Sequence, residues 1–143
     1  MYNIEESIGF LLAKAYQRGF GMFKERLDKF DITPQQFSLL AFLWREDGLS
    51  QSELSHKTQI DRTTIGGLID RLERLELLKR CPHPEDRRAY RICLTDRGKS
   101  LESELCAIAL DVTELYLAPL SADEQGNLRT ILKKIRQWPE NKS

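Results

Sequence analysis

The stretch Asp61-Arg62-Thr63-Thr64-Ile65-Gly66-Gly67-Leu68-Ile69-Asp70-Arg71-Leu72-Glu73-Arg74-Leu75 decides the fold that we predict for this chain. Its apolar residues recur at helical spacing, so one side of the helix should be buried: Ile65, Leu68, Ile69, Leu72 and Leu75. The opposite side carries Thr63, Gly67, Asp70 and Arg74, flanked by Thr64 and Arg71. Such a face can lie in a DNA major groove, where base edges accept hydrogen bonds from hydroxyl and guanidinium groups. An ordinary solvated face has a similar composition.

A short helix and a β wing are predicted on either side of this stretch. Ser50 and Glu53 have the spacing of a capping box, which starts a helix at Gln51 and continues to about residue 57. A turn over 58–60 follows, and Asp61 caps the next helix, where a carboxylate suits the positive end of the helix dipole. Residues 77–81 and 90–94 read as two strands, and the prolines between them favour a projecting loop.

Longer amphipathic helices are predicted towards both ends of the chain. The first runs from Ile4 to Lys29 with Asn3 and Glu6 as its capping box, and a second begins after Thr33 and Pro34. After the wing we expect one helix from Thr95 to about 117, a last helix after Ser121 that includes Trp138, and a frayed tail over 139–143. Their apolar stripes are wider than one small core needs, so two copies should pack together.

Composition indicates a soluble globular protein of one domain. The chain has 143 residues, of which 41% are hydrophobic and 31% charged. No apolar run approaches the roughly 18–20 residues of a membrane span, and the N-terminal residues lack a basic signal region, so a cytoplasmic protein without membrane contact is expected. Net charge is zero, but residues 78–91 hold five basic and two acidic side chains. This local excess favours nucleic-acid binding by the wing.

The residue types that support catalysis or metal binding are sparse. The two histidines, His56 and His83, form no Ser–His or Cys–His pattern, so the chain is not expected to be an enzyme. Cys81 and His83 are fewer than the three or four ligands of a zinc site, and no metal or cofactor is expected. The cysteines Cys81, Cys93 and Cys106 should be reduced thiols. Cys81 and Cys93 fall on the two wing strands, either as small fillers or close to each other.

These motifs together resemble the MarR family of winged helix-turn-helix transcriptional regulators. The resemblance rests on 32–37, 51–54, 61–73 and most specifically 84–98, where Pro84-Glu85-Asp86-Arg87-Arg88-Ala89-Tyr90 leads into Leu94-Thr95-Asp96-Arg97-Gly98. It implies a mainly α fold with a small β wing in a single domain, 1–143. Residues 31–98 would form the DNA-binding lobe, and residues 1–30 and 100–143 would supply dimerisation helices. It also implies a homodimer that binds a pseudo-palindromic operator in double-stranded DNA without a cofactor, most often as a repressor.

The resemblance assigns DNA contacts to three segments. The helix from Arg62 to Leu75 would be the recognition helix, with Arg62, Thr63 and Thr64 at base edges or phosphates and with Gly67, Arg71 and Arg74 further along it. Ser50, Gln51 and Ser52 could donate to phosphate. In the wing, Asp86 would pair with Arg88 and hold an arginine in the minor groove, with Arg87 as the neighbouring candidate.

The resemblance also implies release of DNA by a small molecule bound between the dimerisation helices and the DNA-binding lobe. The lining residues would include Ala15, Tyr16, Gly19, Phe37 and Leu40, and Arg18 could neutralise an aromatic carboxylate or related anion. Core packing explains these residues equally well.

Two other functions stay open at this point. A cysteine-based redox sensor would have to use Cys106 or Cys81, because residues 1–30 contain no cysteine where hydroperoxide-sensing relatives have theirs. A winged-helix protein-interaction module that binds no DNA is favoured by the zero net charge, but the Asp86-Arg87-Arg88 wing counts against it.

Overall fold

The structure is a computed structural model that describes residues 1–137. The helices are α1 (Ile8–Leu27), α2 (Pro34–Arg45), α3 (Gln51–Thr58), α4 (Arg62–Arg74), α5 (Asp96–Ser100), α6 (Glu102–Tyr116) and α7 (Ala122–Gln137). The strands are β1 (Leu49–Ser50), β2 (Leu78–Pro82) and β3 (Tyr90–Leu94), and two 3-10 turns, η1 (Ile4–Glu6) and η2 (Asp28–Phe30), flank α1. Trp138 and the tail predicted over 139–143 lie outside the described residues.

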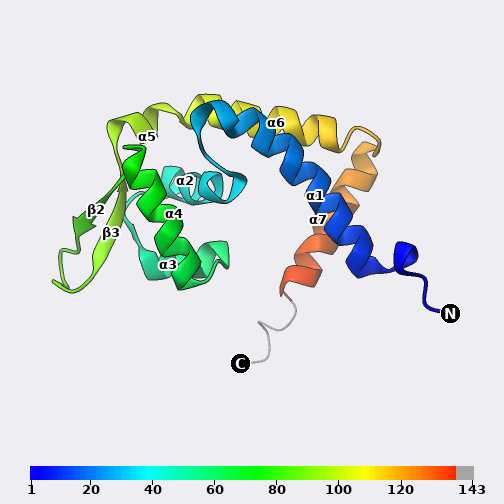
Figure 1. Ribbon diagram of the computed structural model, residues 1–143, viewed down its shortest axis with the longest axis horizontal. Helices are drawn as coiled ribbons and strands as arrows, with labels where there is room; N and C mark the ends of the chain where they lie inside the picture. The colour runs from blue at the N-terminus through cyan, green and yellow to red at the C-terminus, as the bar shows by residue number, and fades with distance from the viewer. Residues whose placement is uncertain (138–143) are drawn as a thin grey trace.

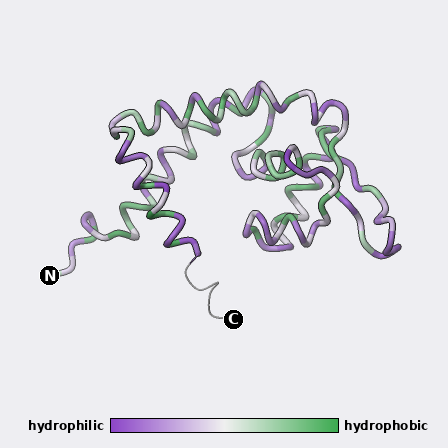
Figure 2. Tube along the Cα trace, turned by 180° about the vertical axis from the view of Figure 1, so that it is seen from behind, coloured by the Kyte–Doolittle hydropathy of each residue, from purple (hydrophilic) through white to green (hydrophobic). Residues whose placement is uncertain are grey.

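The elements separate into two parts that α1 and α6 join (Figure 1). Helices α2, α3 and α4 gather beside the sheet, whereas α1 and α6 run side by side away from them towards α7 and the N-terminus. The core lies in the first part, where leucine and isoleucine side chains from helices and strands are fully buried: Leu39, Leu40, Leu43, Leu54, Ile65, Ile69, Leu72 and Ile92. Along the long helices, hydrophobic and hydrophilic residues alternate (Figure 2). The mainly α winged-helix fold predicted from the sequence is therefore confirmed.

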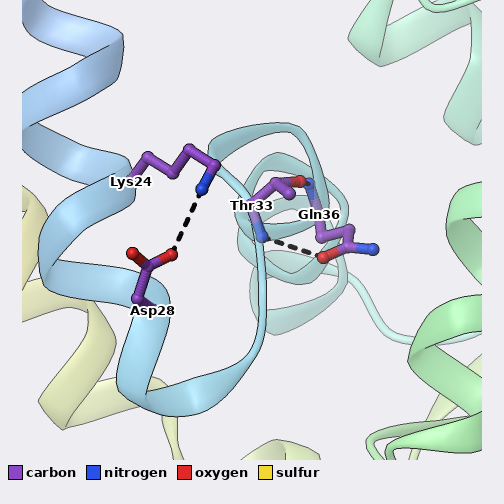
Figure 3. Close-up of polar contacts among 4 residues, drawn as sticks. All are labelled: Lys24, Asp28, Thr33 and Gln36. Carbon is purple, nitrogen blue, oxygen red and sulfur yellow. Dashed lines mark hydrogen bonds and ion pairs between the residues drawn. The ribbon is translucent and has the colours of Figure 1, made fainter.

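The helix starts around the helix-turn-helix follow the predicted capping residues. At α2, the Thr33 N–H donates to Gln36 Oε1 at 2.8 Å while the Gln36 N–H donates to Thr33 Oγ1 at 3.3 Å (Figure 3). Figure 3 also shows Lys24 and Asp28, paired at 3.4 Å where α1 ends. Ser50 and Glu53 make the same reciprocal box at α3. Side-chain oxygens thus satisfy backbone donors that a helix start leaves unpaired.

The wing has three strands rather than the two that we predicted. The order is β1-β3-β2, and the short strand β1 pairs antiparallel with β3, with Leu49 opposite Ile92. A two-residue strand carries no alternation that would reveal it in the sequence. Strand β2 is an edge strand, so Pro82 can end it although proline donates no ladder hydrogen bond.

Two predicted long helices are interrupted. The first was expected to begin at Ile4, but Asn3 caps only the turn η1, and Ser7 then caps α1 by accepting from the Phe10 N–H at 3.3 Å. The helix expected from Thr95 to 117 is divided at Leu101 into α5 and α6. There the Trp44 indole N–H donates to the Gly98 carbonyl at 2.9 Å, so this carbonyl is engaged outside the helix. This hydrogen bond connects α5, which follows the wing, to α2.

Gly98 provides a stability test of this junction. A Cβ at position 98 would lie 2.2 Å from the Leu77 carbonyl oxygen, whereas a Cβ at Gly126 on α7 would meet nothing within 4 Å. Gly98→Ala should lower the free energy of unfolding by about 1–3 kcal/mol because backbone must move. The matched Gly126→Ala should raise it by up to about 1 kcal/mol. Urea unfolding at one fixed protein concentration measures both, and equal effects of the two substitutions would contradict this packing.

Candidate nucleic-acid interface and ligand pocket

Helix α4 divides into a buried and an exposed face as its sequence predicts. Ile65, Ile69 and Leu72 have no exposed surface, because they pack into the core. On the other side, the exposed residues are Thr63, Thr64, Gly67, Asp70 and Arg74. Asp61 caps the helix by accepting from the backbone N–H and the hydroxyl of Thr64, both at 2.9 Å. These hydrogen bonds hold the pKa of the Asp61 carboxyl below its ordinary value, so it is ionised at neutral pH.

The first turns of α3 and α4 meet beside this exposed face. Arg62 Nη2 donates to Ser52 Oγ at 2.9 Å, which joins the two helix starts. Gly66 allows the close approach, because a Cβ there would lie 3.3 Å from Gln51 Nε2, whereas a Cβ at Gly67 would meet open space. Ser50, Gln51, Ser52 and Arg62 are therefore gathered at one edge of the helix pair, with free N–H groups of two helix starts nearby.

Arg71 does not lie free on the flank of the exposed face, where the helical spacing had put it. Its guanidinium pairs with the Asp31 carboxylate at 2.6 Å, across to the turn that connects α1 and α2. Asp31 occupies the left-handed region at φ 61°, in the turn before α2. The pairing is long-range, so the local pattern of α4 gave no sign of it.

Arg80 borders the candidate interface and was not predicted from the sequence. It lies on β2, and its guanidinium pairs with Asp70 at 2.9 Å and with Glu73, both on α4. Its side chain is 27% exposed, so the contact is partly shielded from water. This pair of ion pairs fixes the wing against α4. Arg80 lies two residues after buried Leu78 on β2 and therefore on the same face of the sheet, which is a signal that it faces the helices. Its partners depend on how β2 packs against α4.

The loop between β2 and β3 is organised by backbone hydrogen bonds. The Asp86 carboxylate accepts from the Arg88 backbone N–H at 2.9 Å, and the His83 N–H donates to the Ala89 carbonyl at 3.2 Å. Within residues 1–137, no ion pair joins Asp86 to the Arg88 guanidinium, so the implied side-chain pair is replaced by a pair to the backbone. Arg87 and Arg88 are both exposed. Their guanidinium groups are available to an anionic partner.

A cavity of about 430 Å³ lies between α1, α2 and α6. Of the residues predicted to line it, Tyr16, Gly19 and Phe37 do so. The other three residues do not line it. Leu40 is fully buried in the core, and the Ala15 and Arg18 side chains are not part of the wall.

Ala15 and Arg18 instead contact Tyr116, which lines the cavity. The Ala15 carbonyl accepts from the Tyr116 hydroxyl, and the Arg18 guanidinium lies 5.9 Å from the centre of the Tyr116 ring. Gly19 is required for this contact, because a Cβ there would lie 2.9 Å from the ring. The wall that Tyr116 belongs to was missed because the pairing of α1 with α6 spans about a hundred residues of sequence, beyond any local signal.

The cavity is mainly aromatic and apolar with a few polar groups. Ser38 and Thr113 each donate to a carbonyl of their own helix. The Gln35 amide and the Tyr16 hydroxyl make no hydrogen bond in the part of the chain that the structure describes, so they can bond a ligand. Such a combination is typical of small-molecule sites.

Neither a membrane span nor a metal cluster is found among residues 1–137. None of the described helices is long and apolar enough to cross a bilayer. No group of three or more His, Cys, Asp or Glu side chains in this range could hold a metal ion.

Comparison with known proteins yields consistent matches. The model of the MarR family matches residues 30–89. The HTH-type transcriptional repressor NicR of Pseudomonas putida is 34% identical over 98% of this chain and 89% of NicR. The solved structure of BpsR of Bordetella bronchiseptica, whose DNA binding is regulated by 6-hydroxynicotinic acid, is 30% identical with a TM-score of 0.90 over 95% of this chain and 97% of that one. PcaV of Streptomyces coelicolor, solved with its natural ligand, is 26% identical with a TM-score of 0.86 over 96% and 97%.

Arg80 offers a test of how the wing is fixed. Arg80→Gln should lower the free energy of unfolding by about 1–2 kcal/mol, since it leaves two carboxylates of α4 without their charged partner. The control Arg74→Gln removes an exposed arginine of α4 and should change the free energy of unfolding by no more than about 0.5 kcal/mol. Denaturant titration at pH 7 measures both. If Arg80→Gln were as stable as the control, the ion pairs would contribute nothing to the attachment.

Proposed function

This chain belongs to the MarR family of transcriptional regulators, and from that premise we propose that it is a homodimeric repressor that binds double-stranded DNA. One observation carries the proposal: the exposed face of α4 and the wing arginines Arg87 and Arg88 present polar and cationic groups to solvent. The core and the ion pairs of Arg80 fix α4 and the wing in place. Repression is favoured over activation because NicR is a repressor.

The dimer is supported by apolar side chains that one chain leaves exposed. Ile8 on α1 is 68% exposed, Leu110 on α6 is 71% exposed, and Ile131 and Ile135 on α7 are each 52% exposed. Helix α7 has no buried residue among those described. Apolar surface on this scale is normally covered by a partner. We assign it to a second copy, with residues 1–30 and 100–143 as the dimerisation lobe and 31–98 as the DNA-binding lobe.

In this proposal, the two copies of α4 enter successive major grooves of a pseudo-palindromic site, about 34 Å apart. Thr63, Thr64, Gly67 and Arg74 face the bases, and the Ser50–Ser52 turn with Arg62 contacts phosphate. Arg88, or its neighbour Arg87, enters the flanking minor groove, where a narrow A·T-rich groove concentrates negative potential. Arg71 takes a positioning role instead, because its guanidinium is engaged by Asp31.

The cavity between α1, α2 and α6 is the proposed effector site. Its volume of about 430 Å³ suits a single aromatic ring with substituents. We propose a hydroxylated aromatic acid, because aromatic side chains dominate the walls and because 6-hydroxynicotinic acid regulates BpsR. The Gln35 amide and the Tyr16 hydroxyl would bond its polar groups, and Arg18 behind Tyr116 would favour its negative charge. Such a ligand releases DNA only if it binds the DNA-free geometry more tightly.

DNA binding is tested with the duplex upstream of the chain's own coding region, titrated at several salt concentrations. Wild-type protein should bind as a dimer with an affinity that falls steeply as salt rises. Arg88→Ala should weaken binding about tenfold or more and reduce the salt slope by about one unit. Arg26→Ala removes the same charge from α1, outside the proposed DNA-binding lobe, and should leave the salt slope nearly unchanged.

The opposite outcome would also be informative. If the wild-type protein bound neither that duplex nor a random operator library at low salt, the regulator proposal would fail. A protein-interaction module would then explain the fold.

The effector site is tested by filling the cavity. Ala109 lines the cavity from α6, whereas Ala107 on the same helix is exposed. With 6-hydroxynicotinic acid as the probe, wild-type protein should lose DNA affinity as the acid is added. Ala109→Phe should bind DNA without this response, and Ala107→Phe should respond like wild type. An unchanged response of Ala109→Phe would mean that the acid acts elsewhere.

A further inference from the structure

Cys81 and Cys93 lie on the same face of the wing sheet. In the β2–β3 register, Cys81 is opposite Arg91 and Cys93 is opposite Lys79, so the two cysteines are diagonal neighbours on adjacent strands. Side chains alternate between the faces of a sheet, and Leu78, Ile92 and Leu94 occupy the buried face. The cysteines therefore share the face that is turned away from α4.

The surroundings leave both residues partly exposed and favour the thiol form of Cys93. Both residues are half-buried rather than enclosed. Burial and a hydrogen bond with the Cys81 thiol raise the pKa of Cys93 to about 11, and the Asp47 carboxylate acts in the same direction while Arg91 opposes it. Since oxidants react with the thiolate, the raised pKa makes Cys93 a poor sensor of peroxides. Burial likewise raises the pKa of Cys106 on α6.

The spacing also disfavours a direct disulfide. Diagonal neighbours on antiparallel strands have Cα atoms roughly 7–8 Å apart. A disulfide joins residues whose Cα atoms are at most about 7 Å apart. One additional atom between the two sulfurs lengthens the bridge, and the β2–β3 ladder fixes the backbone positions of both cysteines.

We propose that Cys81 and Cys93 form a two-thiol site that chelates a trivalent arsenical or a similar thiophilic centre. Thiol sulfur is a soft ligand and suits soft centres. With an organoarsenic oxide, two S–H bonds and the arsenic–oxygen bond break, two As–S bonds form, and both protons leave with the oxygen as one water. No oxidation state changes. The chelate would pin β2 to β3 at the base of the loop that carries Arg87 and Arg88.

This proposal is independent of DNA binding, since the site lies on the free protein, and it is tested there. Reduced full-length protein is treated with phenylarsine oxide and then with excess 2-mercaptoethanol, which removes arsenic held by one thiol but not by two. Intact mass spectrometry should show one phenylarsenic group retained per chain in wild type and in Cys106→Ser. Cys81→Ser and Cys93→Ser should each lose it, and dithiothreitol should remove it from wild type.

Circular dichroism shows whether each serine variant is folded, and a thiol titration adds a second measurement. Of the three thiols of the chain, arsenic should protect two in the wild type and two in Cys106→Ser. Protection that needs Cys106, or arsenic that 2-mercaptoethanol removes fully from wild type, would overturn the proposal. So would a bridge between two chains.

Discussion

The burial of one side of α4 is the constraint on which the rest of the structure depends. Ile65, Ile69 and Leu72 have no exposed surface, and they pack against leucines of α2 and α3 and against the sheet. Burying each such side chain contributes about 1.5–3 kcal/mol, more than any ion pair on the outer side is expected to supply. The helix cannot rotate without exposing them, so the opposite residues are presented to solvent in a fixed orientation.

Ion pairs further fix α4 in the orientation that hydrophobic packing provides. Arg71 connects α4 to the turn before α2, and Arg80 connects it to β2, so the C-terminal part of α4 is tied to two different neighbours. These ion pairs involve Arg71, Asp70 and Glu73 on α4, Arg80 on β2 and Asp31 in the turn before α2. In each pair the positive and negative charges offset each other. The zero net charge of the chain therefore conceals which cations are engaged and which are free.

The sequence was informative where the determining interactions are local. The capping residues Thr33, Ser50 and Asp61 act within three residues of themselves, and each cap is found as predicted. The Gly98 carbonyl near the interruption at Leu101 is bonded by Trp44, and the third strand pairs with β3, and both partners are distant in the chain. The same distinction applies to the candidate site. The two faces of α4 could be predicted from local periodicity, whereas the role of Arg80 and the α6 wall of the cavity depend on long-range pairing.

A path of contacts leads from the cavity to the base of the wing through two aromatic side chains and then through a hydrogen bond to the backbone. Phe37 in the cavity wall packs edge-on against Phe23, with ring centres 4.9 Å apart, and against Trp44 at 5.9 Å. The Trp44 indole in turn donates to the Gly98 carbonyl, and Gly98 lies against the Leu77 carbonyl where β2 begins. Close-packed groups respond to a displaced neighbour by moving, since little free volume separates them. Phe37 is therefore in contact with α1 through Phe23 and is connected to the base of the wing through Trp44 and Gly98.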